Sequence, residues 1–252
     1  MVESLSLQAV LIIVLALVAG GFIKGITGMG LPTVAIPVLA IFLGVEHAVI
    51  VMVFPVMALN AWLVWRHRDC ANQFPEMPRL LLAGCVGAPL GAWFLVAASD
   101  RVLSAILSVW LVVYILLRFL HPNFSLSLRS RYRLSPLTGF CSGALQAATG
   151  MSAPAIATYF HALKLEPRAY IYAVATPFLV ISVVQFATLV SLGVYTSALL
   201  LESLLAAIPA MLVIPLGASF AGKIKKQVFD NIILGLLITA SIRLLYSAIW
   251  GG

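Results

Sequence analysis

Long apolar runs separated by short polar segments follow one another along almost the whole chain. A run of about 18 or more apolar residues with few charges is typical of a transmembrane helix. The clearest runs are Leu80–Ala97, Val102–Leu120, Tyr170–Leu192, Ala198–Ala221 and residues 228–250. The first run, Leu5–Phe22, lacks the basic start and small-residue cleavage site of a signal peptide, so we expect it to be retained. The pattern predicts an all-α integral membrane protein.

Composition supports the same class. Of the 252 residues, 63% are hydrophobic and only 9% are charged, and the mean hydropathy is +1.12. A soluble domain keeps roughly a quarter of its residues charged. The lipid bilayer is therefore the expected environment of the chain.

Basic residues indicate which side of the membrane each polar segment faces. Twelve of the 15 Lys and Arg residues fall in four segments. They are Arg66, Arg68 and Arg79; Arg118, Arg129, Arg131 and Arg133; Lys164 and Arg168; and Lys223, Lys225 and Lys226. Because cytoplasmic loops carry an excess of Lys and Arg, we expect these segments to be cytoplasmic and both termini to lie outside. The basic pI of about 9.6 is thus a topology signal, and no nucleic-acid partner is expected.

The chain contains an internal repeat. Residues 21–25 match 139–143 at an offset of 118, and residues 27–32 match 149–154 at 122. Pro55 matches Pro177 at 122, and residues 89–92 match 215–218 at 126. The offset grows in steps of four, about one helical turn, which keeps helix faces in phase.

The repeat and the charge pattern together predict two halves of opposite orientation. The segment after 80–97 should lie outside, whereas its repeat partner after 198–221 should lie inside. We expect residues 1–118 and 135–252 to form an inverted-topology repeat, joined by a basic cytoplasmic linker at 119–134. Secondary transporters use this arrangement and bind substrate near the membrane midplane, on interrupted helices.

Each half carries one interruption, a Thr-Gly-Met (TGM) stretch inside apolar sequence. In the second half the flanking pieces Pro136–Ala148 and Ser152–Ala162 are each long enough to cross only about half of the hydrocarbon core, which predicts a re-entrant pair. In the first half Leu31–Leu43 is short but Leu5–Ile26 is long, so residues 5–44 form either two spans or a re-entrant pair. With three spanning helices in each half, about 8–10 membrane segments are expected.

The TGM stretches favour anion binding. The first N–H groups of a helix have no partner within it, and they lie at the positive end of its dipole. Pro32 and Pro154 come early in the returning helices, where a missing N–H costs little. Two such helix starts in opposed halves would present backbone donors to one negatively charged substrate. The alternative is that these Gly and Pro residues only ease helix packing.

These motifs resemble a known family. Two copies of G-F-x-x-G followed by T-G-M-x-x-P, in a polytopic chain with a basic central loop, are similar to the sulfite exporter (TauE/SafE) family of membrane permeases. The resemblance covers essentially the whole chain. It implies a bacterial inner-membrane secondary transporter for sulfite, thiosulfate, an organosulfonate or a related anion. The positions that match the family's glycine-rich repeats are Gly25, Thr27, Gly28, Gly30, Gly143, Thr149, Gly150 and Ser152. Ser152 stands where the first half has Gly30, so the two binding edges need not be identical.

Two cations within apolar runs are further candidates. Lys24 lies one turn before the first TGM stretch, where its ammonium suits an anionic substrate, unless it snorkels to an interface. Arg243 lies well inside residues 228–250 and either faces the substrate cavity, pairs with Glu202 or snorkels outward.

Uncharged polar residues inside the apolar runs either line the cavity or cross-link helices. The full predicted substrate-binding set is Lys24, Gly25, Thr27, Gly28, Met29, Gly30, Asn60, Gln146, Thr149, Gly150, Met151, Ser152, Gln185 and Arg243.

The sequence shows no catalytic constellation. HExxH, GxSxG and P-loop motifs are absent, so neither an enzyme nor a cofactor nor a metal site is expected.

We expect most remaining ionisable residues to be solvated: His47, His67, His121, His161, Glu46, Asp69, Glu76, Asp100, Glu166 and Asp230. A passive anion channel and a scaffold subunit remain alternatives to a transporter. A coupling proton or other ion and a homodimer are left open.

Overall fold

The computed structural model describes residues 7–27, 30–119, 128–220 and 226–250. This part of the chain is built from ten α-helices and one 3₁₀ helix, η1, without strands. Their bounds are α1 Leu7–Thr27, α2 Leu31–Leu43, α3 Val45–Arg66, η1 Arg68–Gln73, α4 Met77–Ala97, α5 Asp100–Phe119, α6 Leu128–Thr149, α7 Ala153–His161, α8 Pro167–Ser191, α9 Ser197–Ser219 and α10 Lys226–Trp250. The predicted all-α class is confirmed.

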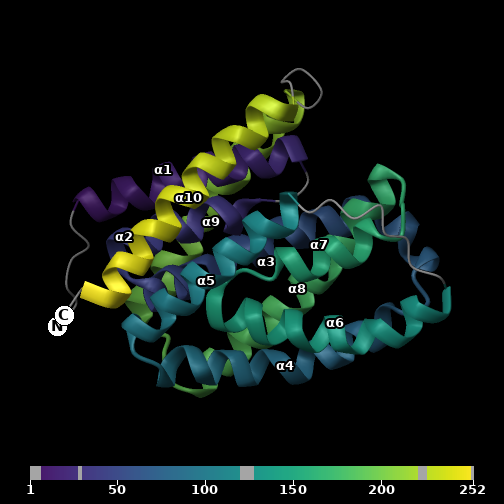
Figure 1. Cartoon of the computed structure of the whole chain (residues 1–252), viewed down its shortest axis with the longest axis horizontal. Coiled ribbons are helices and arrows are strands. Elements are labelled where there is room, and N and C mark those ends of the chain that lie inside the picture. Colours follow the sequence, from purple (N-terminus) through teal and green to yellow (C-terminus); the bar gives the residue numbers. More distant parts are fainter. Residues whose placement is uncertain (1–6, 28–29, 120–127, 221–225, 251–252) are drawn as a thin grey trace.

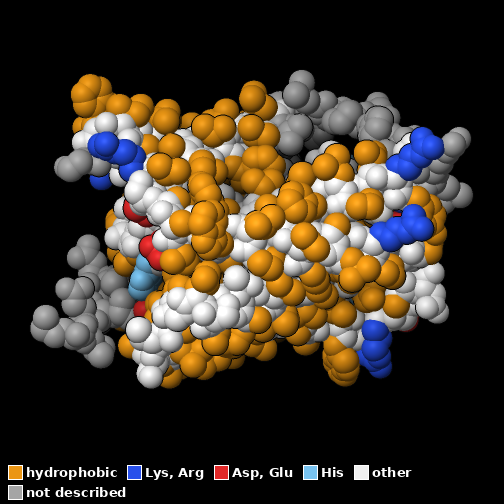
Figure 2. Space-filling model, turned by 90° about the horizontal axis from the view of Figure 1, so that it is seen from below, with side chains coloured by type: hydrophobic (Ala, Val, Ile, Leu, Met, Phe, Trp, Pro, Cys, Tyr) orange, Lys and Arg blue, Asp and Glu red, His pale blue; other side chains and the backbone are white. Residues whose placement is uncertain are grey.

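The apolar runs become helices within a few residues of the predicted bounds. Four described helices are long and apolar enough to cross a membrane, namely α3, α4, α8 and α9. Large apolar side chains remain exposed on the outer faces of these helices, for example Leu82 at 69% and Leu212 at 74%. Figure 2 shows hydrophobic side chains spread over one face, with Lys and Arg gathered toward its ends. Such a surface suits contact with lipid rather than with water.

Both interrupted segments form a long helix followed by a short one. The predicted short piece Leu31–Leu43 is α2, and Ser152–Ala162 corresponds to α7. The prediction that Pro136–Ala148 forms a short descending piece is wrong, because α6 begins at Leu128 and has 22 residues. Its extra turns carry the cations Arg129, Arg131 and Arg133, which an apolar pattern does not register. The second half of the predicted linker is therefore helical.

The halves are interlocked through close helix contacts. In Figure 1, α4 and α6 lie side by side, and α10 packs on α5 and α2. A Cβ at Gly91 of α4 would collide with the carbonyl oxygen of Ala144 on α6. Likewise, a Cβ at Gly25 of α1 would lie 2.9 Å from Cα of Gly217 on α9. Small residues thus let these backbones touch, as in many membrane helix pairs.

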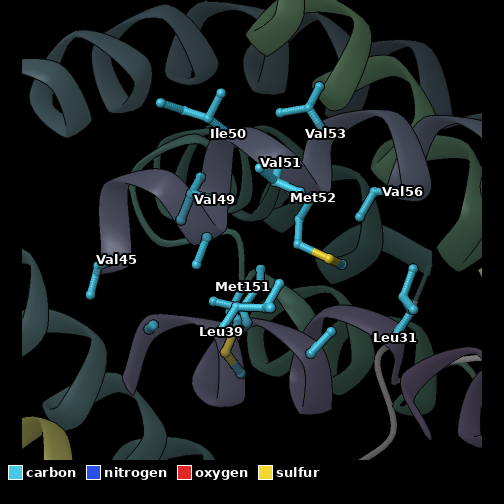
Figure 3. Packing of buried hydrophobic residues seen from close by; sticks show 14 of the residues in the cluster. Leu31, Leu39, Val45, Val49, Ile50, Val51, Met52, Val53, Val56 and Met151 are labelled. Atoms are coloured by element: carbon cyan, nitrogen blue, oxygen red, sulfur yellow. The ribbon is translucent and has the colours of Figure 1, made fainter. Parts of the chain in front are cut away.

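A buried core connects the second interruption to the first half. Met151, between α6 and α7, is 1% exposed and belongs to the same core as α2 and α3. Figure 3 shows Met151 in the same cluster of apolar side chains as Leu39 of α2 and Met52 of α3. The turn after α6 is therefore anchored in the other half of the chain.

Candidate functional site

A buried lysine forms the first element of the site. Lys24 of α1 is 5% exposed, and its Nζ donates a hydrogen bond to Oδ1 of Asn60 on α3 at 2.8 Å. Asn60 is 2% exposed, and its Nδ2 donates to the Val56 carbonyl at 2.8 Å. The alternative that Lys24 snorkels to an interface is wrong, because its ammonium lies within the protein.

A neutral network on the second half forms the next element. Nε2 of Gln146 donates to Oγ of Ser182 at 2.8 Å and to the Phe178 carbonyl at 3.1 Å. Its Oε1 accepts a hydrogen bond from Oγ of Ser152 at 3.0 Å. Gln146, Ser152 and Ser182 are all buried. This network connects α6, α8 and the start of α7.

The two elements occupy matching positions in the repeat. Lys24 and Asn60 are 36 residues apart, and so are Gln146 and Ser182. Adding 122, the offset of the TGM stretches and of Pro55 and Pro177, to the first pair gives the second pair, whereas the G-F-x-x-G motif that contains Lys24 is itself offset by 118. The same helix-to-helix hydrogen bond is therefore made twice, once by an ammonium and an amide and once by an amide and a hydroxyl.

The second TGM turn is held by its own hydrogen bonds. Gly150 has a φ of 69° and donates its N–H to the Gln146 carbonyl at 2.7 Å, which ends α6 with a left-handed glycine. The Met151 N–H donates to Oγ1 of Thr149 at 3.3 Å, and Trp110 Nε1 donates to the Met151 carbonyl at 2.7 Å. The N–H groups of Gly150 and Met151 are therefore already bonded, so fewer backbone donors are free to bind an anion than the sequence predicts. Ser152 and the first residue of α7 carry the N–H groups for which helix geometry provides no partner.

A small cavity adjoins this turn. Its volume is about 10 Å³, close to the space that one water molecule needs. Nε2 of Gln185 in its wall donates to the Ala147 carbonyl at 3.2 Å. The lining residues are Ile36, Val49, Met52, Val53, Val56, Gln146, Gly150, Ser182 and Gln185. The cavity has a polar wall from the second half and an apolar wall from the first, and in this conformation it is too small for a sulfur oxyanion.

The first TGM turn is only partly within the described structure. Gly28 and Met29 lie outside the described residues, and Thr27 is the last residue of α1. Gly30 precedes α2 with a φ of 112°, a conformation that favours glycine. The structure gives Gly25 and its repeat partner Gly143 close packing contacts with α9 and α4, respectively.

Arg243 does not join the cavity beside Gly150. It is exposed on α10 and lines a separate cavity of about 180 Å³ between α10 and α2. The predicted alternative of a pair with Glu202 is wrong, since Oε1 of Glu202 lies 2.7 Å from Nε2 of His47. This pair joins α3 of the first half to α9 of the second.

One buried ion pair was not predicted from the sequence. Glu76 was expected to be solvated, yet it is 0% exposed and pairs with Arg131 of α6. The Arg131 guanidinium also lies 5.6 Å from the Phe74 ring centroid, and its carbonyl accepts from the Tyr159 hydroxyl at 2.9 Å. The sequence offered one indication of this pair. Arg131 and Glu76 lie in segments assigned to the same side of the membrane, where opposite charges can form an ion pair.

His67 is a second exception to the expected solvation. It is 9% exposed at the end of α3, and its Nδ1 is buried without a hydrogen-bond partner. Burial lowers the pKa of His67 below its usual value, and the positive charges of Arg168 and Arg66 lower it further. In the described part of the chain no three His, Cys, Asp or Glu side chains gather in a way that could hold a metal ion.

Comparison with known proteins agrees with the motifs and the helical architecture. The family model described as Sulfite exporter TauE/SafE matches residues 12–244. Comparisons with curated proteins and with solved structures found no match. The family is one of membrane permeases rather than of enzymes. Since the match covers nearly the whole chain, the protein belongs to the sulfite exporter TauE/SafE family.

Proposed function

We propose that this protein is a secondary transporter that moves a small sulfur-containing anion across the bacterial inner membrane. Sulfite, thiosulfate and organosulfonates are the expected substrates. The observation that carries the proposal is the Lys24 ammonium, which is buried against the neutral amide of Asn60. In the described part of the chain no acidic side chain pairs with it. Charging a buried amine without a counter-ion is costly, so a substrate anion would stabilise the charged form of Lys24 on arrival.

The proposed site extends from Lys24 to the second TGM turn. Val56, which accepts from Asn60, also lines the cavity that Gly150 lines. An anion that enlarged this cavity would have the ammonium on one side and the hydroxyl and amide groups of Ser152 and Gln146 on the other. The N–H groups that start α7 would add donors at a positive helix end. Thr27–Gly30 would make the matching contribution from the first half.

We further propose that the halves form an inverted repeat about an axis in the membrane plane. The matched Lys24–Asn60 and Gln146–Ser182 hydrogen bonds support it. The helix contacts also support it. Helix α1 packs on α9, and in the repeat α6 corresponds to α1 and α4 corresponds to α9. Helices α6 and α4 likewise pack on each other. The counterparts α3 and α8 are in contact, as are α5 and α10. A two-fold relation brings equivalent helices together in this way.

Transport then requires the site to open alternately to the two sides. The cavity of about 10 Å³ is consistent with a closed conformation. A passive channel would instead hold a continuous pore, and a scaffold subunit would need no cavity at the TGM turns.

Proteoliposomes that contain the purified protein would test this proposal. Uptake of radiolabelled sulfite, thiosulfate, taurine, sulfoacetate and sulfate should saturate for at least one sulfur anion, and unlabelled substrate inside should accelerate it. Lys24→Met should remove that uptake while the protein still elutes as a monodisperse peak in detergent. Flux that does not saturate would favour the channel. Absence of both flux and binding for every anion would favour the scaffold.

A further inference from the structure

Arg243 is an exposed cation on an apolar flank. Its neighbours on α10 that also face outward are large and apolar, including Ile242 at 64%, Ile249 at 57% and Trp250 at 73% exposure. On the adjacent helix α2, Phe42 is 58% exposed. This flank has the composition of a lipid-facing surface, in which a bare guanidinium is unfavourable.

No group in the described part of the chain satisfies the Arg243 guanidinium. The ion pairs of the described residues join other side chains, and Glu202 is taken by His47. A guanidinium has five N–H donors in a planar fork that matches the oxygen atoms of carboxylates and phosphates. The Arg243 guanidinium is therefore available to an oxyanion that comes from outside the described chain.

The cavity beside Arg243, here called the groove, has a volume and lining residues that suit the phosphate group of a phospholipid. Its volume is about 180 Å³, several times the roughly 30 Å³ that one water occupies in the liquid. Ala40, Ile41 and Leu244 supply apolar walls, and Tyr246 and Ser247 lie beside Arg243 on α10. We propose that this groove binds the phosphate group of a membrane phospholipid through Arg243, with the glycerol and upper acyl chains against the apolar walls.

The position along α10 suits a headgroup. Trp250 at the end of the helix is seven positions after Arg243, a rise of about 10 Å. Trp and Tyr concentrate at membrane interfaces, and arginine side chains reach toward them from within the bilayer. Tyr246 and Trp250 are both exposed. The phosphate would thus belong to the leaflet that faces the C-terminus, which is the outer one if the proposed topology holds.

Thermal unfolding of the delipidated protein in detergent, with lipid added back, would test the site. Phosphatidylglycerol should raise the midpoint more than diacylglycerol, which has the same chains but no phosphate. Arg243→Gln should lower the apparent affinity for phosphatidylglycerol by about tenfold and leave the effect of diacylglycerol unchanged. A loss of this size is expected when one charged hydrogen-bonding partner is removed. Arg79→Gln is the control. It removes an exposed cation from α4, outside the groove, and should keep the full response to phosphatidylglycerol.

A second variant and a competition measurement make the test specific to a lipid phosphate. Ser247→Phe, which fills the groove without changing charge, should also weaken the lipid effect, and it serves if Arg243→Gln does not fold. Equal stabilisation by diacylglycerol, or an unchanged response of Arg243→Gln, would overturn the proposal. Complete competition by millimolar inorganic phosphate or sulfite would assign the groove to a free anion instead. If the proteoliposome assay showed no anion transport, the proposal of this lipid site would still stand, because the groove shares no lining residue with the cavity beside Gly150.

Discussion

The Nζ atom of Lys24 lies 2.8 Å from Oδ1 of Asn60, and both side chains are buried. The equivalent bond in the second half, between Gln146 and Ser182, is also 2.8 Å long but involves no charge. The hydrogen bond between the two helices is thus present in both halves, but only the bond in the first half involves a basic side chain. Under the proposed function, an anion bound between the halves would meet one ammonium, that of Lys24.

We expect that Asn60→Asp weakens anion binding although Lys24 is retained. The new carboxylate would lie within hydrogen-bonding distance of the ammonium and neutralise it, so the substrate would lose its counter-ion. The loss should be on the order of tenfold or more in affinity. Isothermal titration with the transported anion would measure it.

Ser182→Ala is the matched control for Asn60→Asp. It removes the equivalent partner in the second half without altering charge, and the Phe178 carbonyl remains available to Gln146. Its effect on affinity should be markedly smaller. If Asn60→Asp and Ser182→Ala weaken binding equally, the ammonium is not the counter-ion of the substrate.

Gly150→Ala should impair transport more than Gly193→Ala. Both glycines have a positive φ, 69° and 72°, so each substitution adds strain of about 1–2 kcal/mol. A Cβ at Gly193 meets nothing within 4 Å, whereas one at Gly150 would collide with Cδ1 of Ile36. The extra crowding lies in the wall of the cavity, so initial rates of uptake in proteoliposomes should separate the two variants.

A second substitution would identify the cause. Ile36→Val shortens the side chain that a Cβ at Gly150 would meet, so it should partly restore uptake by Gly150→Ala. Equal rates for Gly150→Ala and Gly193→Ala would show that crowding at the cavity has no role.

The stability of the protein should fall as the pH is lowered through the titration of His67. Its pKa is below the ordinary value in the folded protein, so the unfolded chain binds the proton more readily. Stability is therefore full above about pH 6.5 and decreases below it as the unfolded state takes up protons. His67→Gln should reduce this slope between about pH 5 and 6.5, as measured by thermal unfolding in detergent. An unchanged slope would assign the pH response to other groups.

Labelling from outside should distinguish the two proposed faces. In a variant without Cys70, Cys85 and Cys141, a single cysteine at exposed Ser99 should react with a membrane-impermeant maleimide in intact cells. A single cysteine at exposed Asn72, between α3 and α4, should react only after the membrane is permeabilised. The reverse result would invert the topology inferred from the basic residues.

The sequence by itself determined the membrane class, most helix positions and the repeat. Apolar length and loop charge act locally along the chain, so they can be read without a fold. The range Leu31–Leu43 was predicted to the residue because Pro32 and Gly44 limit it at either end. The start of α6 was missed because a cationic helix that continues an apolar one leaves no hydrophobic signal.

Only the tertiary structure decided which polar residues meet. Lys24 and Asn60 are 36 residues apart, and nothing in their local sequence states that α1 and α3 bring them together. The same applies to Glu76 and Arg131, which form an ion pair between the two halves, and to Arg243, which lines a cavity separate from the one beside Gly150. Each outcome depends on helix rotation and on which faces pack against each other. These are set by long-range contacts such as that of Gly91 with Ala144, and a pattern along the chain does not contain them.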